Sequence, residues 1–140
     1  MYPLGHFGLA YFLVVLLRRF IREDYSLPLV LVASIAPDLD ILFSGYIVHR
    51  GPTHSVIVMT ILFAPVYLFF RRGLPYYFAL LSHSLVGDYF TAYGVQLFWP
   101  VLEEWYVAPR GFLLTGVEQA FFEVGLFMLM VIHILLRRAS

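Results

Sequence analysis

Six side chains that could bind a metal ion lie in one part of the sequence, between long apolar runs. Imidazole suits zinc and other transition ions, whereas carboxylates also accept manganese or magnesium and can bridge two ions. Because ionisable groups are costly inside apolar segments, their concentration here indicates a functional site. The candidate metal ligands are Asp38, Asp40, His49, His54, His83 and Asp88.

The composition is that of a membrane protein. Apolar residue types make up 61% of the 140 residues, charged types make up 13%, and the mean hydropathy is +0.84. Soluble domains are about half apolar and about a quarter charged. The length predicts a single domain, residues 1–140. A formal net charge of zero gives no basis for binding nucleic acid, and the absence of cysteine excludes disulfides, thiolate nucleophiles and cysteine-ligated zinc.

The apolar runs predict an all-α, polytopic membrane protein with five helices. The second run contains Pro37 followed by two acids, which is a poor interior for a helix that faces lipid. We therefore expect this helix to break near Pro37, so that irregular backbone lines a polar cavity and both Asp38 and Asp40 can turn inward. The expected helices are residues 3–17, 27–43, 52–70, 75–93 and 112–136.

The arginines predict the orientation in the membrane, since cytoplasmic segments carry an excess of Lys and Arg. Five spans with the N-terminus outside and the C-terminus in the cytoplasm leave only Arg50 and Arg110 outside. We therefore expect a multi-pass protein of the cell membrane in this orientation. The arginines placed on the cytoplasmic side are Arg18, Arg19, Arg22, Arg71, Arg72, Arg137 and Arg138.

This orientation puts the candidate ligands in the outer half of the membrane, where the metal site is expected. His6 begins the first helix at the outer face and is a further candidate metal ligand. Glu118, near the outer end of the fifth helix, is either a ligand or base of the site or a partner in helix packing. His133 and residues 23–24 fall on the cytoplasmic side and are expected to stay outside the site.

Arg50 adds a group that could bind an anion beside the metal. It precedes the third expected helix, whose N-terminal amides and dipole also favour anions. Metal, arginine and helix N-terminus together are suited to hold a phosphate ester. A water activated by the metal would be the nucleophile, and a carboxylate such as Asp40 or Glu118 would be the base.

These motifs resemble the family of small membrane-bound metal-dependent hydrolases related to bacterial YdjM. The resemblance covers residues 6 to about 100: it includes His6, residues 37–40 and residues 83–100, and its most specific part is the string HRGPTHS at 49–55. The order of motifs is also similar to that of zinc-dependent phospholipase C relatives, whose helical site binds several zinc ions. The resemblance implies a metal-dependent hydrolase acting on phosphate esters of membrane lipids, with one or more divalent ions.

Zinc is the first candidate for these ions, and manganese or magnesium are the alternatives.

The fourth helix departs from the spacing that the resemblance implies. Its His and Asp are expected four residues apart, about 40° around a regular helix, but His83 and Asp88 are five apart, about 140°. A π-bulge permitted by Gly87 would restore a common face. Without this bulge, Asp88 would either contact a metal ligand without touching the metal itself or have a purely structural role.

Three functions remain open from the residues alone. The first is a membrane-embedded hydrolase of phosphate esters that opens to the outer leaflet. The second is a non-catalytic membrane protein whose metal holds the helices together. The third is an ion or proton transporter that uses the same groups as a relay. We rank the hydrolase first because Arg50 stands beside a ligand set larger than one structural ion needs.

The first prediction concerns topology. A reporter fused after Ser140 should be cytoplasmic, and one inserted into the loop 94–111 should lie outside, because of the distribution of arginines. Compartment-specific reporters at both positions measure this. If both positions report the same side, the five-span arrangement is wrong. The expectation that all candidate ligands lie in the outer half of the membrane is then wrong as well.

Overall fold

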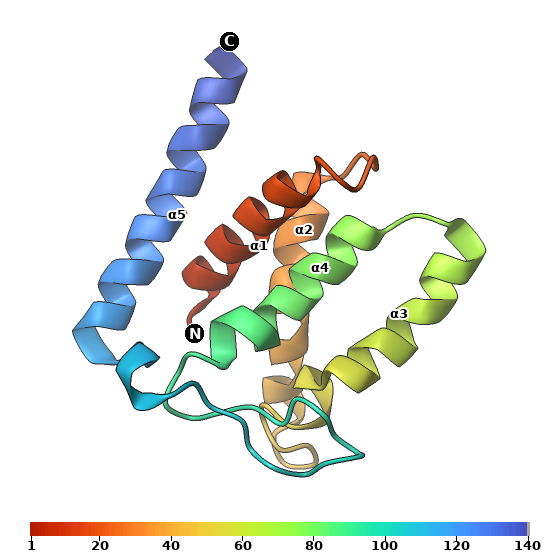
Figure 1. Cartoon of the computed structure of the whole chain (residues 1–140), viewed down its shortest axis with the longest axis vertical. Helices are drawn as coiled ribbons and strands as arrows, with labels where there is room; N and C mark the ends of the chain where they lie inside the picture. Colours follow the sequence, from red (N-terminus) through yellow and green to blue (C-terminus); the bar gives the residue numbers. More distant parts are fainter. Residues whose placement is uncertain (140) are drawn as a thin grey trace.

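The computed structural model describes residues 1–139 and is all-α, as predicted (Figure 1). Within these residues there is no β-strand, only two isolated bridges between loop residues. The first helix has the predicted limits. The five α-helices are α1 (Pro3–Leu17), α2 (Leu27–Ile35), α3 (Val56–Phe70), α4 (Leu74–Ser82) and α5 (Gly116–Ala139).

Helix α1 is the centre of the packing. It contacts α2, α4 and α5, whereas α3 leans away from the bundle and contacts α4 (Figure 1). The buried core between α1, α2 and α4 consists of Ala10, Val14, Val30 and Ala79. Such small side chains let helix backbones approach closely, which is how helices associate when lipid tails remove the hydrophobic driving force.

Two of the predicted departures from regular helix are confirmed. Helix α2 ends at Ile35 and continues as a 3-10 helix, η1 (Ala36–Phe43), because Pro37 can neither donate a helical hydrogen bond nor fit the α-helical turn before it. Helix α4 continues as a π-helix, η3 (His83–Asp88), which is the bulge expected at Gly87.

The remaining predicted boundaries need correction. A 3-10 turn, η2 (Pro52–His54), precedes α3, which begins at Val56 because the Ser55 hydroxyl accepts hydrogen bonds from the amides of Ile57 and Val58. The fourth helix ends at Asp88 rather than at Tyr93. The fifth begins at Gly116 rather than at Phe112, after a short 3-10 turn, η4 (Arg110–Phe112).

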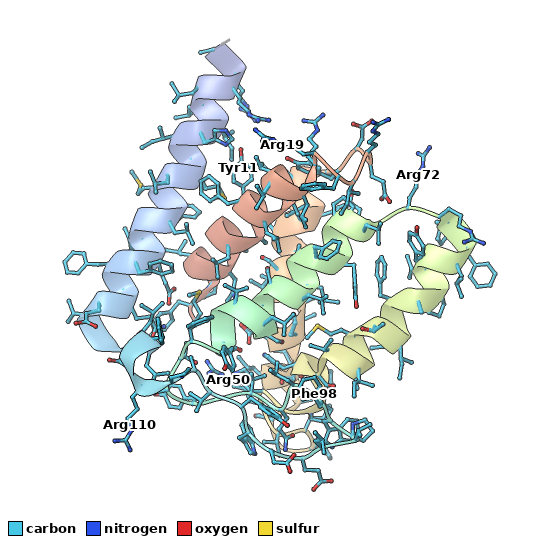
Figure 2. The ribbon with its side chains drawn as sticks, viewed as in Figure 1. Tyr11, Arg19, Arg50, Arg72, Phe98 and Arg110 are labelled. Atoms are coloured by element: carbon cyan, nitrogen blue, oxygen red, sulfur yellow. The ribbon has the colours of Figure 1, made fainter. Side chains whose placement is uncertain are left out.

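The two groups of arginines lie at opposite ends of the molecule. Arg19 and Arg72 are at the end that holds the C-terminus, while Arg50 and Arg110 are at the other end, with the long loop that follows η3 (Figure 2). Among residues 1–139, only α5 is both long and apolar enough to cross a bilayer; α1 and α3 are apolar but shorter. The number of spans therefore stays a prediction.

Candidate metal centre

Two histidines and two carboxylates meet inside the fold, at the end opposite the C-terminus. Asp38 comes from η1, His54 from η2, and both His83 and Asp88 from η3. The Nε2 atoms of His54 and His83 lie 3.1 Å apart, and each is 3.3–3.4 Å from Asp38 Oδ1 and from Asp88 Oδ2. We call these four residues the four-ligand centre. Asp38 is its most exposed member, at 22% of its side chain.

The spacing of these four atoms fits one ion in tetrahedral coordination. Zinc holds nitrogen and carboxylate oxygen at about 2.0–2.2 Å, so the ligands of a tetrahedral site are about 3.3–3.6 Å from one another. The distances found here are within a few tenths of an ångström of that range. The backbone breaks in η1 and η3 make this convergence possible, since the π-helix turns His83 and Asp88 to the same side.

Hydrogen bonds fix which nitrogen of His83 faces the centre. Its Nδ1 lies 2.7 Å from the carbonyl oxygen of Ser34 and must therefore donate to it, which leaves the lone pair of a neutral ring on Nε2. The Ser34 carbonyl cannot accept a 3-10 hydrogen bond from residue 37, because Pro37 has no N–H. The same proline thus breaks α2 and provides the acceptor that orients this ring.

His54 is oriented in the same way from the other side. Thr53 Oγ1 donates its one hydrogen to Asp40 Oδ2 at 2.6 Å and so accepts from His54 Nδ1 at 3.0 Å. The lone pair of the neutral His54 ring is then on Nε2, facing the centre. Two imidazole lone pairs and two carboxylate oxygens therefore converge on one buried point, and Asp88 Oδ2 has no hydrogen-bond partner. Such a set of donors fits a divalent cation.

Asp40 lies behind His54 rather than in the four-ligand centre. Besides Thr53, it accepts from His49 Nδ1 at 2.7 Å and from the Arg50 amide at 3.3 Å, and it is buried. Asp40, His49 and His54 form a second group whose geometry could hold a metal. However, His54 already turns Nε2 to the first group, so Asp40 is placed to orient the ligand ring. With both oxygens engaged, it is poorly placed to be the predicted base.

His49 and His6 flank the centre on different sides. His49 is 35% exposed, and its Nε2 lies 3.9 Å from Asp38 Oδ1. His6 is fully buried, stacks on the His83 ring at 3.7 Å between centroids, and has no hydrogen-bond partner at either nitrogen. Gly87 makes room for it, because a Cβ there would lie 2.4 Å from the His6 ring. Metal binding by these two histidines stays a prediction.

Arg50 reaches the centre from the loop before η2. Its Nη2 lies 3.2 Å from Asp88 Oδ1, its Nη1 donates to Thr91 Oγ1 at 2.6 Å, and its guanidinium lies 5.2 Å from the centroid of the Tyr93 ring. Arg50 and Tyr93 line two cavities, of about 490 Å³ and about 430 Å³. The chain thus places a cation between a candidate metal ligand and open space.

The predicted contribution of helix amides to an anion site is wrong. At the start of α3, the amides of Ile57 and Val58 bond the Ser55 side chain, and the amide of Val56 donates to the Leu97 carbonyl. Arg50 is therefore the group that remains from the predicted cradle. Thr91, which holds the guanidinium, had no separate signal in the sequence beyond its place in the family motif.

The two acidic residues of α5 differ in burial. Glu118 is exposed in the first turn and belongs to neither group of candidate ligands. Glu123 is buried instead, and its carboxylate accepts from the Tyr2 amide and the Gln119 side chain, which ties α5 to the start of α1. His133 lies outside the site, as expected, and is hydrogen-bonded to the Tyr11 hydroxyl at 2.8 Å.

The second prediction tests the four-ligand centre. His54→Ala and Asp38→Ala should each release bound metal, because each removes one of four converging ligands. His133→Ala is the matched control and should keep its metal, since this ring bonds Tyr11 away from the centre. Elemental analysis of the purified proteins measures the content. Full retention in both ligand variants would refute the site.

The third prediction separates Asp40 from the direct ligands. Asp40→Asn should weaken metal binding by about 10- to 100-fold, the usual effect of losing a group that orients a ligand, yet still reach full occupancy at high metal concentration. Asp38→Asn should not reach full occupancy. Titrating metal into the metal-free variants measures both the affinity and the maximal occupancy. An Asp40→Asn protein that cannot be saturated would make Asp40 a ligand.

The comparisons with known proteins concern the family of the chain. The family model described as YdjM inner membrane protein matches residues 1–139. No curated protein and no solved structure matches the chain. The similarity to phospholipase C stays a prediction. Because the match covers nearly the whole sequence, the chain belongs to the YdjM inner membrane protein family and is a membrane protein.

Proposed function

We propose that this protein is a membrane-bound, metal-dependent hydrolase of phosphate esters, with membrane lipids as the source of substrate. The observation that carries the proposal is the pairing of Arg50 with Asp88 at the edge of the four-ligand centre, where the guanidinium also lines two cavities. A metal-binding group and a cation that face the same space are what a phosphate ester needs for binding and charge neutralisation.

Each group has a separate part in this proposal. Asp38, His54, His83 and Asp88 would hold the ion, with zinc as the first candidate and manganese or magnesium as alternatives. A bound divalent ion supplies Lewis acidity and an activated water. Asp40 fixes the His54 ring through Thr53. Arg50 would bind phosphate oxygens through the guanidinium N–H groups not used by Thr91 and Asp88.

A structural metal is the second candidate, and one observation favours it. Four protein ligands in a nearly closed tetrahedron are typical of structural zinc, whereas catalytic sites usually keep one position open. The exposure of Asp38 and the adjoining cavities favour the hydrolase. A transporter has less support, because His133 on the far side bonds Tyr11 and does not continue a polar path from the site.

The topology proposed for this function has five spans, with the N-terminus outside and the C-terminus in the cytoplasm. The opposite placement of the two arginine groups supports it (Figure 2). In this orientation the four-ligand centre and Arg50 lie at the outer end of the bundle. A substrate would then come from the outer leaflet.

The fourth prediction tests the role of Arg50. Arg50→Ala should keep its metal, because removing a cation beside Asp88 makes that carboxylate no worse a ligand. It should lower turnover of a phosphate ester about 100- to 1000-fold, the usual effect of removing a charge-stabilising donor, about 2.7–4 kcal/mol. Arg50→Lys should recover only part of the lost turnover, since lysine lacks the planar guanidinium that can bond two phosphate oxygens at once. Turnover and metal content are measured on the same samples.

Arg110→Ala is the matched control, since Arg110 is exposed at the same end of the molecule and should not affect turnover (Figure 2). If the metal only holds the helices together, no ester will be cleaved by the wild type. Unchanged turnover in Arg50→Ala would contradict the phosphate-binding role of Arg50 but would not contradict the metal site.

A further inference from the structure

Two cavities of different polarity adjoin beside the start of α5. The first, the polar cavity, measures about 490 Å³ and is lined by Arg50, Thr91 and Gln119 among others. The second, the apolar pocket, measures about 280 Å³ and lies between α1, η3, η4 and α5. Met1 and Leu114 line both, so the two spaces are neighbours on either side of these side chains. The apolar pocket is completed by Leu9, Val86, Phe90, Phe112 and Phe122.

The two cavities follow one another along α5. Gly116 and Gln119, in the first turn, line the polar cavity, and Phe122 lines the apolar pocket. Six residues of α-helix span about 9 Å, so the lining contributed by α5 changes from polar to apolar over that length, while Phe112 and Leu114 line the pocket from before the helix. In the proposed topology this direction leads from the outer surface towards the hydrocarbon core. A phospholipid has the same order, with its phosphate at the surface and its acyl chains below.

The polar cavity can select the head of such a molecule. Arg50 presents a guanidinium there, held by Thr91 and Asp88, and a guanidinium has five N–H donors in a planar fork. The apolar pocket can accept a chain from the side, since Phe112, Phe122 and Val86 keep 68%, 42% and 40% exposure. Lipid tails are as apolar as this pocket, so the chain itself adds little affinity in a bilayer. Selection must therefore come from the phosphate.

We propose that the protein binds a phosphate-bearing lipid with its phosphate at Arg50 in the polar cavity and an acyl chain in the apolar pocket. The inference rests on the proposed function for the choice of a phosphate headgroup. It adds the position of the acyl chain. It makes Leu9, Phe112 and Phe122 residues that contact the acyl chain, while Arg50 selects the phosphate.

Photo-crosslinking in nanodiscs tests this lipid site without requiring turnover. The probes are phosphatidic acid with a diazirine on its acyl chain and diacylglycerol with the same chain but no phosphate. Labelling of Phe112 and Phe122 should be about tenfold stronger with phosphatidic acid, the effect of one charge-assisted hydrogen bond. Labelling on the exposed face of α3, at Phe69, should be equal for both probes.

Variants separate the head from the tail. Arg50→Ala should reduce labelling by phosphatidic acid at Phe122 to the level of diacylglycerol, and Leu9→Trp should do the same by filling the pocket. Leu68→Trp, an exposed position on α3 that lines neither cavity, is the matched control and should change nothing. If Leu9→Trp does not fold, Leu9→Phe and Arg50→Ala carry the test.

Equal labelling by both probes, unaffected by Arg50→Ala, would show that the pocket holds only bulk lipid and would overturn the inference. Turnover of a soluble phosphate ester would then still support the hydrolase. Conversely, preferential labelling by phosphatidic acid in a protein that cleaves no ester would uphold this lipid site and remove the proposed hydrolysis. The two failures are therefore distinguishable.

Discussion

Four lone pairs facing one buried point are the constraint on which the rest of this structure depends. In the neutral rings of His54 and His83 the hydrogen is on Nδ1, so each Nε2 turns a lone pair towards the two carboxylate oxygens, which can only accept. With neither a cation nor an added proton between them, these four atoms would bury like partial charges within about 3.5 Å of one another, which costs several kcal/mol. The helices are therefore arranged around a site that a divalent ion can stabilise.

That constraint explains why the helical segments that begin as α2 and α4 leave α-helical geometry at the end that holds the site. A regular helix would turn His83 and Asp88 to different faces and would hide the Ser34 carbonyl in its own hydrogen bonding, so the chain uses a π-helix at Gly87 and a 3-10 helix after Pro37. In a bilayer such backbone is tolerated only where protein or a polar cavity covers it. The opposite half of the bundle is regular helix packed through small residues such as Ala10 and Ala79.

The sequence predicted the elements whose signals are local, and it missed those that depend on tertiary contacts. Pro37 and Gly87 are local signals, and both backbone breaks were predicted from them. Asp38 and Asp40 could not be told apart, since two acids one residue apart look alike until Thr53 is seen to bond only one of them. Glu118 could not be assigned to the site or to helix packing from the sequence, because its exposure depends on where α5 meets the rest of the fold.

Arg50 lies between the candidate metal centre and the adjoining cavity, and this position would couple the binding of a metal to the binding of an anion. Because of its contact with Asp88, the proposed metal site and the proposed phosphate site would share one carboxylate. An ion at the centre would draw charge from Asp88 and so weaken that ion pair, which frees the guanidinium for a phosphate in the adjoining cavity. Without the ion, Asp88 Oδ1 pairs with Arg50 at 3.2 Å and with the N-terminal ammonium of Met1 at 2.7 Å. The two binding events are therefore expected to favour one another, and by thermodynamic linkage that effect is equal in both directions.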